Sequence, residues 1–156
     1  MRPAKRSETS MTKTDVLPRT YATLRFAGDD LDPAEISAIL PAKPVRAHRK
    51  GEAFEAGPRS GKLTGRTGIW YFDTRDLDSP RLADHLRRIV DLLYPEPGST
   101  ERVERLRAVL GRERAEAHVS CFWYGKRGAR PPVIPEAVRA ALARVPAEID
   151  TDFDTD

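Results

Sequence analysis

Strict alternation of apolar and polar side chains near the start of the sequence is the feature that most limits how this chain can fold. Residues 19–28, RTYATLRFAG, follow a period of two, which places one set of side chains on each face of an extended strand. Such a strand buries one face against a core and leaves the other polar. The apolar set is Ala22, Leu24 and Phe26, and the polar set is Tyr21, Thr23 and Arg25.

The C-terminal segment AEIDTDFDTD, residues 147–156, alternates in the same way and predicts another strand with one carboxylate face. Carboxylates along one face of a strand lie about 7 Å apart and cannot fold around a single ion, so we expect no calcium site here. The carboxylate set is Glu148, Asp150, Asp152 and Asp154, and the opposite set is Ile149, Thr151 and Phe153.

Helical and strand patterns alternate along the rest of the chain. The link between the second and third strands contains no helix, which allows a hairpin. The sequence therefore predicts an α+β fold, with a mixed, largely antiparallel sheet, helices packed on it and the order β-α-β-β-α-α-β-α-β. The opening and closing strand–helix–strand units look alike, which is compatible with a weak internal duplication. The predicted elements are strand 19–28, helix 31–40, strands 44–52 and 68–74, helices 80–93 and 100–110, strand 116–126, helix 135–145 and strand 147–156.

Capping residues predict where several of these elements begin and end. Asp32 can cap the first helix, with Pro33 at its first position and Glu35 completing a capping box. The helix that follows Pro80 is predicted to be the longest, and Gly111 is predicted to end the next one. Residues 53–68 are polar and rich in glycine, which predicts a loop.

The net charge of the chain is located in its first residues. Residues 1–19 hold five basic and two acidic residues, which accounts for the whole formal charge of +3. We expect these residues to form a disordered basic tail and residues 20–156 to form a single α+β domain. Because that domain is neutral, nucleic-acid binding loses its main support. No apolar run could span a bilayer and no signal peptide is visible, so we expect a cytoplasmic protein without a membrane partner.

Metal and redox chemistry lack their usual residues. Cys121 is the only cysteine, so neither an intramolecular disulfide nor a multi-cysteine metal site can form. His48, His85 and His118 have no short ligand spacing, and we expect no metal and no cofactor. Since His118 and Cys121 are three residues apart in a predicted strand, their side chains should point to opposite faces and cannot form a catalytic pair.

A glycine–lysine pair in EAGPRSGKLTG, residues 55–65, raises the question of a phosphate-binding loop. Such a loop requires the pattern G-x-x-x-x-G-K-[ST] between a strand and a helix. Here Ala56 stands where the first glycine belongs and Leu63 where the hydroxyl residue belongs, and the segment leads into a strand. We interpret it as a flexible charged connection and not as a nucleotide-binding loop.

Two oppositely charged segments form a second candidate site. Residues 43–66 hold seven basic residues and two glutamates, whereas residues 148–156 hold five carboxylates and no basic residue. Two interpretations remain open. The segments complement each other within one sheet or across a cleft, or the basic segment is available to an acidic protein partner or a small anionic ligand.

The order of several short motifs resembles a known bacterial family, the one catalogued as domain of unknown function 4279. The motifs are KGE at residues 50–52, Trp70 in the third predicted strand, SCFW at residues 120–123 and the acidic ending EIDTDFD. The likeness spans residues 20–154. It implies a small, soluble bacterial α+β domain, and since the family has no assigned reaction, it transfers no functional residues to this chain.

The leading functional hypothesis is a non-enzymatic binding module for an acidic protein partner or a small anionic ligand, of which immunity or antitoxin-like neutralisation is one form. The alternative is a small enzyme with a site around Lys50, Glu52, Trp70 and Trp123, in which Glu52 is a general base. A homodimer formed through an exposed strand is a third option. The residues predicted to bind are Arg46, Lys50, Glu52, Arg59, Lys62, Trp70 and Trp123.

Overall fold

The computed structural model of the protein describes residues 19–55 and 61–156. The predicted disordered tail, residues 1–19, lies outside the described residues except for Arg19. That residue is held at the start of the domain, because its guanidinium donates a hydrogen bond of 2.7 Å to the backbone carbonyl of Arg75.

Five strands form one mixed sheet with the order β2-β5-β1-β6-β7. The central strand β1 runs antiparallel to both neighbours, β2 runs antiparallel to β5, and β7 runs parallel to β6. The predicted α+β class, the mixed sheet and the element order are confirmed. The strands are β1 (Tyr21–Gly28), β2 (Arg46–His48), β5 (Gly68–Asp73), β6 (Glu116–Gly125) and β7 (Ala147–Thr155).

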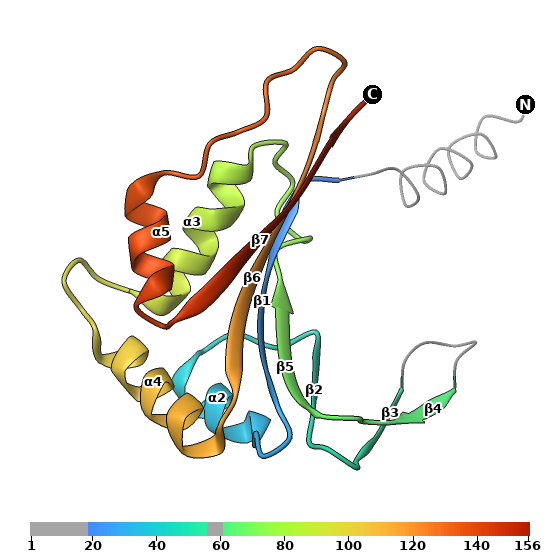
Figure 1. The fold of residues 1–156 in the computed structure, drawn as a ribbon, viewed down its shortest axis with the longest axis vertical. Coiled ribbons are helices and arrows are strands. Elements are labelled where there is room, and N and C mark those ends of the chain that lie inside the picture. Colours follow the sequence, from blue (N-terminus) through green and yellow to red (C-terminus); the bar gives the residue numbers. More distant parts are fainter. Residues whose placement is uncertain (1–18, 56–60) are drawn as a thin grey trace, which may run out of the picture.

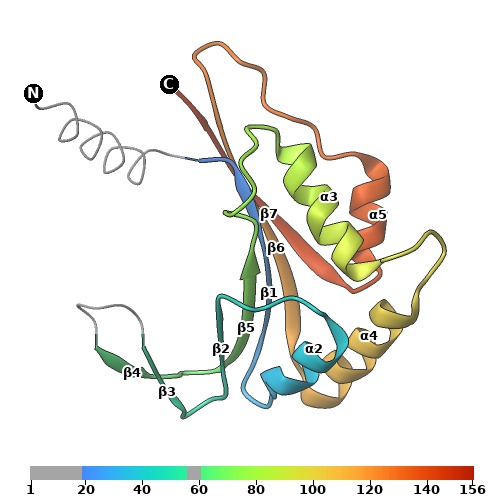
Figure 2. The same cartoon turned by 180° about the vertical axis from the view of Figure 1, so that it is seen from behind.

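The helices cover one face of this sheet, and none of those in residues 19–55 and 61–156 lies on its other face. Figure 1 and the reverse view in Figure 2 both show them on one side of the strands, with α2 beside α4 and α3 beside α5. The sheet therefore has one core face, packed against the helices, and one open face. The helices are α2 (Pro33–Ile39), α3 (Leu82–Leu93), α4 (Glu101–Glu113) and α5 (Glu136–Ala143).

The alternation of β1 explains this one-sided packing. Ala22, Leu24 and Phe26 are fully buried on the core face, whereas Arg25 on the open face is exposed. Trp70 in β5 joins the same core: its ring centroid lies 5.7 Å from that of Phe26. Its indole N–H donates a hydrogen bond of 3.0 Å to the hydroxyl of Ser37 in α2, which satisfies the one polar atom of this buried side chain.

A short hairpin occupies part of the segment that the sequence predicted as a loop. Strands β3 (Ala53–Glu55) and β4 (Lys62–Thr64) pair with each other and form a separate two-stranded sheet. Figure 1 shows this hairpin projecting from β2 and β5 on the side of the sheet away from the helices. Three-residue polar strands carry too little alternation to stand out from a loop in sequence.

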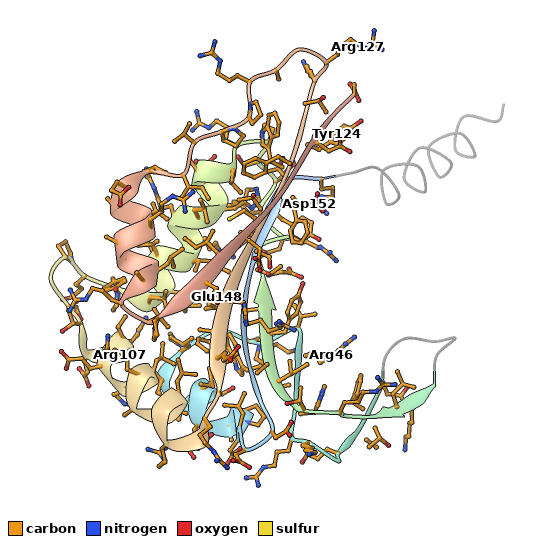
Figure 3. The ribbon with its side chains drawn as sticks, in the orientation of Figure 1. Arg46, Arg107, Tyr124, Arg127, Glu148 and Asp152 are labelled. Atoms are coloured by element: carbon orange, nitrogen blue, oxygen red, sulfur yellow. The ribbon has the colours of Figure 1, made fainter. Side chains whose placement is uncertain are left out.

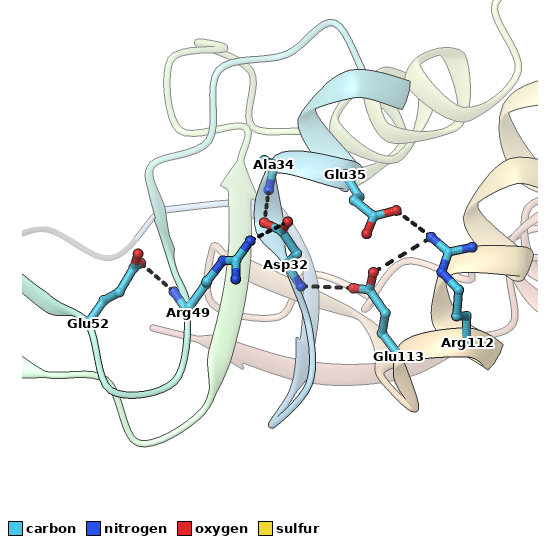
Figure 4. A network of polar contacts seen from close by, with 7 residues as sticks. All are labelled: Asp32, Ala34, Glu35, Arg49, Glu52, Arg112 and Glu113. Atoms are coloured by element: carbon cyan, nitrogen blue, oxygen red, sulfur yellow. Dashed lines mark hydrogen bonds and ion pairs between the residues drawn. The ribbon is translucent and has the colours of Figure 1, made fainter.

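Asp32 caps the N-terminus of α2 as predicted, but the predicted capping box with Glu35 does not form. The Asp32 carboxylate accepts a hydrogen bond from the backbone N–H of Ala34 (3.0 Å), and its second oxygen lies 2.6 Å from the guanidinium of Arg49 (Figure 4). The backbone N–H of Asp32 was expected to bond to Glu35. Instead it donates to Glu113 of α4 at 2.8 Å, so the capping-box prediction is wrong.

Glu35 turns instead toward α4, where it pairs with Arg112 (Figure 4). Arg112 also lies 3.6 Å from Glu113, so this arginine bridges the two carboxylates that flank the start of α2. Burial raises the pKa of Glu113, and its hydrogen bond with Glu35 adds to that rise. The network fixes α2 against α4 across 81 residues of sequence.

The helix α4 does not end at Gly111 as predicted. It continues to Glu113 and ends where Arg114 adopts a left-handed backbone conformation (φ 51°). With 13 residues it is one residue longer than α3, which had been predicted to be the longest. The extra turn matters because it carries Arg112 and Glu113, the two residues of α4 that contact the start of α2.

We predict that Glu113→Ala lowers the free energy of unfolding by about 1–3 kcal/mol, because it leaves the partly buried N–H of Asp32 without its acceptor. Glu113→Gln should recover more than half of the loss, since an amide oxygen can accept the same bond. Urea denaturation provides the measurement, with Arg105→Ala on the exposed side of α4 as control. Equal losses of unfolding free energy in the Ala and Gln variants would show that Glu113 does not act as the hydrogen-bond acceptor for Asp32.

Candidate functional site

A hollow on the open face of the sheet brings together arginine side chains from separate parts of the sequence. Its volume is about 390 Å³. Arg25 comes from β1, Arg46 from β2 and Arg75 from the turn after β5, with Tyr71 among them. The lining is completed by Val45, Ile69 and Asp73, so three guanidinium groups face one carboxylate. We call this set the arginine hollow.

The strand register brings these residues together. Arg46 is paired with Tyr71, and Tyr71 is paired with Arg25, so the three side chains form one row across β2, β5 and β1. The row continues through His118 in β6 to Glu148 in β7. Paired residues on neighbouring strands lie about 5 Å apart, so Arg25 and Arg46, which are separated by Tyr71, lie about 10 Å apart along the row.

Arg75 is held in place by the aromatic ring of Tyr21. Its guanidinium lies 4.2 Å from the centroid of that ring and donates a hydrogen bond of 2.6 Å to the Tyr21 hydroxyl. This hydrogen bond is the main reason that the pKa of Arg75 is raised. Its neighbour Asp73 accepts a bond from the Arg75 backbone N–H at 3.0 Å and lies 4.0 Å from the guanidinium.

Tyr71 adds a neutral hydrogen-bond donor to the hollow. Burial is the main cause of the raised pKa of its phenol, and the negative charge of Asp73 adds to the rise. The hydroxyl therefore stays protonated at neutral pH. Three guanidinium groups and one phenol are all donors, a combination that suits the oxygen atoms of carboxylate or phosphate groups.

The opposite edge of the open face is acidic. Glu148 in β7 lies 3.5 Å from the ring of His118, and His118 also lies 3.5 Å from Glu116. Alternation along β7 puts Asp150, Asp152 and Asp154 on the same face as Glu148, and all are exposed. Figure 3 shows Arg46 near β2 and Glu148 and Asp152 along β7. We call these four carboxylates the acidic ladder.

The described parts of the two charged segments lie at opposite edges of the sheet. Strand β2 forms one edge and β7 the other, with β5, β1 and β6 between them. Among the described residues, no ion pair joins residues 43–66 to residues 148–156. For these residues, the interpretation of direct complementation within the molecule does not hold.

The basic residues predicted to bind are only partly brought together. Arg46 lines the arginine hollow, whereas Lys50 lies in a turn, 3.1 Å from Asp29. Lys62 is exposed on β4 of the hairpin. Arg59 lies outside the described residues. Glu52 is exposed and accepts a hydrogen bond of 2.7 Å from the backbone N–H of Arg49, which closes the turn before β3.

The predicted tryptophans lie on the other face of the sheet. Trp70 is fully buried under α2. Trp123 packs half-buried against Phe153, with ring centroids 6.0 Å apart. Because Glu52 and Lys50 lie in a turn and both tryptophans belong to the core face, these four residues do not converge on one site.

Cys121 and His118 occupy opposite faces of β6, as the spacing predicted. Cys121 is fully buried on the core face, and burial raises the pKa of its thiol to about 11. His118 lies on the open face in the row with Arg25 and Glu148. A thiol with this pKa is almost entirely protonated at neutral pH, which makes it a poor nucleophile.

His48 fastens the β3–β4 hairpin to the edge of the sheet beside the arginine hollow. Its ring stacks on Phe54 of β3 with centroids 4.2 Å apart, and the guanidinium of Arg46 lies 5.0 Å from the centroid of the same phenylalanine. Gly65 permits this packing, since a Cβ atom there would lie 2.4 Å from the His48 ring. Burial lowers the pKa of His48, and the charge of Arg46 lowers it further.

In a larger hollow on the helix side, both arginines already have partners within the protein. This hollow has a volume of about 600 Å³ and includes Arg88 and Arg102. Arg88 donates two hydrogen bonds to Asp76 (3.2 and 2.9 Å), and Arg102 donates to the carbonyl of Leu92 at 2.7 Å. The arginine hollow differs because, among the described residues, neither Arg25 nor Arg46 has a carboxylate within 4.0 Å.

Sequence reasoning missed Arg25, Tyr71 and Arg75 as site residues. The alternation of β1 placed Arg25 on its polar face, and the same period in β5 places Tyr71 on a face opposite Trp70. Neither pattern shows which strands are neighbours. The register that aligns them with Arg46 joins residues about 20 to 50 positions apart and could not be derived from a single sequence.

Comparison with known proteins gives one match. The family model described as Domain of unknown function (DUF4279) matches residues 18–156, nearly the whole chain. No curated protein and no solved structure matches significantly. Within residues 19–55 and 61–156, none of the helices is long and apolar enough to cross a membrane. In that same part of the chain, no three His, Cys, Asp or Glu side chains are grouped so as to hold a metal ion.

We predict that acidification weakens the fold through His48. Its pKa is lower in the folded protein than the ordinary value of 6.5, so the unfolded chain takes up the proton first. The stability that neutral His48 contributes is fully present above pH 6.5. It is lost as the pH falls through the pKa that His48 has in the folded protein. Chemical denaturation at a series of pH values should show a smaller loss for His48→Gln than for the unaltered protein. If the unfolding free energies of the two proteins changed equally with pH, His48 would not be the group responsible for the loss of stability.

Proposed function

The chain belongs to the family described as Domain of unknown function (DUF4279), and we propose that this member is a binding module whose open sheet face recognises anionic groups. The arginine hollow is the proposed contact site. Its ligands are the carboxylates of an acidic protein partner or a small anionic ligand. Neutralisation of a partner protein, as immunity proteins and antitoxins do, is one form that such recognition takes.

One observation carries the proposal: Arg25 and Arg46 flank Tyr71 in a single row, and neither is paired with a carboxylate among the described residues. This arrangement differs from that of Arg49, Arg88 and Arg112, each of which contacts an acidic side chain. Guanidinium groups bind carboxylate or phosphate through two parallel hydrogen bonds. A row of unpaired guanidiniums on an open face supports recognition of several such groups.

The exposure of the site favours binding over catalysis. Both Arg25 and Arg46 are exposed to solvent, so the hollow does not exclude water from a reacting group. The enzyme alternative required Glu52 to be partly buried beside Lys50. Glu52 is exposed and its carboxylate is engaged in the turn, and Lys50 is paired with Asp29. These contacts support a binding surface over the small enzyme.

We predict that the paired substitution Arg25→Ala with Arg46→Ala weakens binding of an aspartate hexapeptide at least about tenfold, since each lost charged hydrogen bond is worth about 1.5–3 kcal/mol. Calorimetric titration at low salt provides the measurement, and binding by the unaltered protein should fall as salt is added. Inorganic phosphate and citrate, titrated in parallel, distinguish a small anion from a peptide.

Arg87→Ala is the matched control, because Arg87 is exposed on α3 in the helix layer. It removes the same charge as each substitution in the hollow but lies on the other side of the sheet. The control should bind the hexapeptide as the unaltered protein does. If the paired variant and the control bind all three probes equally, or the unaltered protein binds none of them, the proposed function is wrong.

A further inference from the structure

We propose that the acidic partner of this face is a second copy of the same chain, with two open faces stacked so that each arginine hollow meets the acidic ladder of the other copy. The inference rests on the proposed function, since it uses the hollow as the site that receives carboxylates. It goes beyond that function by naming the partner and the geometry of the complex.

The open face is complementary to itself. Its β2, β5 and β1 side carries Arg46, Arg25 and Arg75, and its β7 edge carries the acidic ladder. A two-fold axis that lies between the sheets, parallel to the strands and over the boundary between β1 and β6, keeps the position along the strands. It places β6 of one copy over β1 of the other, and β7 over β5. Glu148 of one copy then lies over Tyr71 of the other, between Arg25 and Arg46.

The centre of the face has the composition of an interface core. Tyr21 and Phe122 stack on each other with ring centroids 4.5 Å apart, and both are half-buried. Ser120 and Thr23 are paired beside them and carry no charge. A stable interface places aromatic residues at its centre and charges at its rim, and a C2 interface must use the same patch on both copies.

The β3–β4 hairpin provides an additional contact for this arrangement. It projects on the open-face side from the β2 edge (Figures 1 and 2), which the two-fold axis places beside β7 of the second copy. The exposed basic residues Lys62 and Arg66 lie on and just after β4. The hairpin of each copy therefore lies beside the acidic ladder of the other.

Pairing of two copies through the edge of β7 is disfavoured by the same ladder. Two antiparallel β7 strands in a continuous sheet would place carboxylates on the same face, directly opposite one another, and like charges in that position are destabilising. The other edge strand, β2, has only three residues. Face-to-face stacking, and not edge pairing, is thus the dimer that the charges support.

The size of the face sets the expected affinity. Four overlapping strands about 4.8 Å apart and about 25 Å long give a footprint of about 500 Å². Standard interfaces bury about 800 Å² from each partner, so the expected dimer is small and dissociates readily on dilution. Because its rim contacts are charged, the dissociation constant should rise at least about tenfold between about 20 mM and about 500 mM salt.

The test is sedimentation velocity on the full chain with two charge-reversed variants. The first variant carries Arg25→Glu and Arg46→Glu, and the second carries Glu148→Lys and Asp150→Lys. Each variant alone should be monomeric at concentrations where the unaltered protein is dimeric, because both rims of its homodimer would carry like charges. An equimolar mixture of the two variants should form a dimer again, since both rims of the mixed pair are then complementary.

Recovery in the mixture is the decisive result, because misfolded variants could not produce it. Failure of the mixture to dimerise, or a monomeric unaltered protein at every concentration, overturns the dimer. The Glu148→Lys, Asp150→Lys variant retains the arginine hollow, so the aspartate hexapeptide separates the two proposals. If the unaltered protein is monomeric but both proteins bind the peptide, the dimer fails and the proposed function stands. If neither protein binds the peptide, both fail.

Discussion

Strand β1 packs apolar side chains on only one of its faces, and this one-sided packing determines where the helices lie and which face of the sheet stays open. Ala22, Leu24 and Phe26 are completely buried, and the helices lie over them. Because β1 is the central strand, its residues are paired with residues of β5 on one side and of β6 on the other. Paired residues lie on the same face, so all three strands have the same core face and the same open face. Burying these side chains removes apolar surface from water at about 25 cal/mol per Å², which favours a helix layer on that face. The open face follows as a consequence, and its side chains are the ones not required for the core.

The charges of the open face are arranged by strand order and not by sequence order. Basic residues of β2, β1 and the turn after β5 lie together, while the acidic ladder of β7 lies at the far edge. The domain is neutral as a whole, yet this face is polarised from one edge to the other. Neutral, half-buried aromatic residues such as Tyr21 and Phe122 lie between the two regions. Such a surface attracts carboxylates to one side and repels them from the other, a charge distribution that would orient an acidic partner of the kind we propose.

The sequence predicted those features that depend on neighbouring residues. Periodicity located β1 and β7, and Asp32 was correctly identified as the cap of α2, because a cap contacts the backbone two residues away. The acceptor for the backbone N–H of Asp32 was missed because Glu113 is 81 residues distant. The arginine hollow was missed for the same reason: Arg25 and Arg46 become neighbours of Tyr71 only once β5 is inserted between β1 and β2. Trp70 was proposed as a contact residue from its type, but its strand position directs it into the core.

We propose that this protein binds acidic groups through the open face of its sheet and not through the helix layer. Backbone amide chemical shifts, measured by NMR while an acidic peptide is added, can locate the binding surface. The largest changes should fall on Arg25, Arg46, Tyr71 and their neighbours in β1, β2 and β5, and amides in α3 and α5 should change little. Changes concentrated on α3 and α5, or spread evenly over the surface, would show that the open face is not the binding surface.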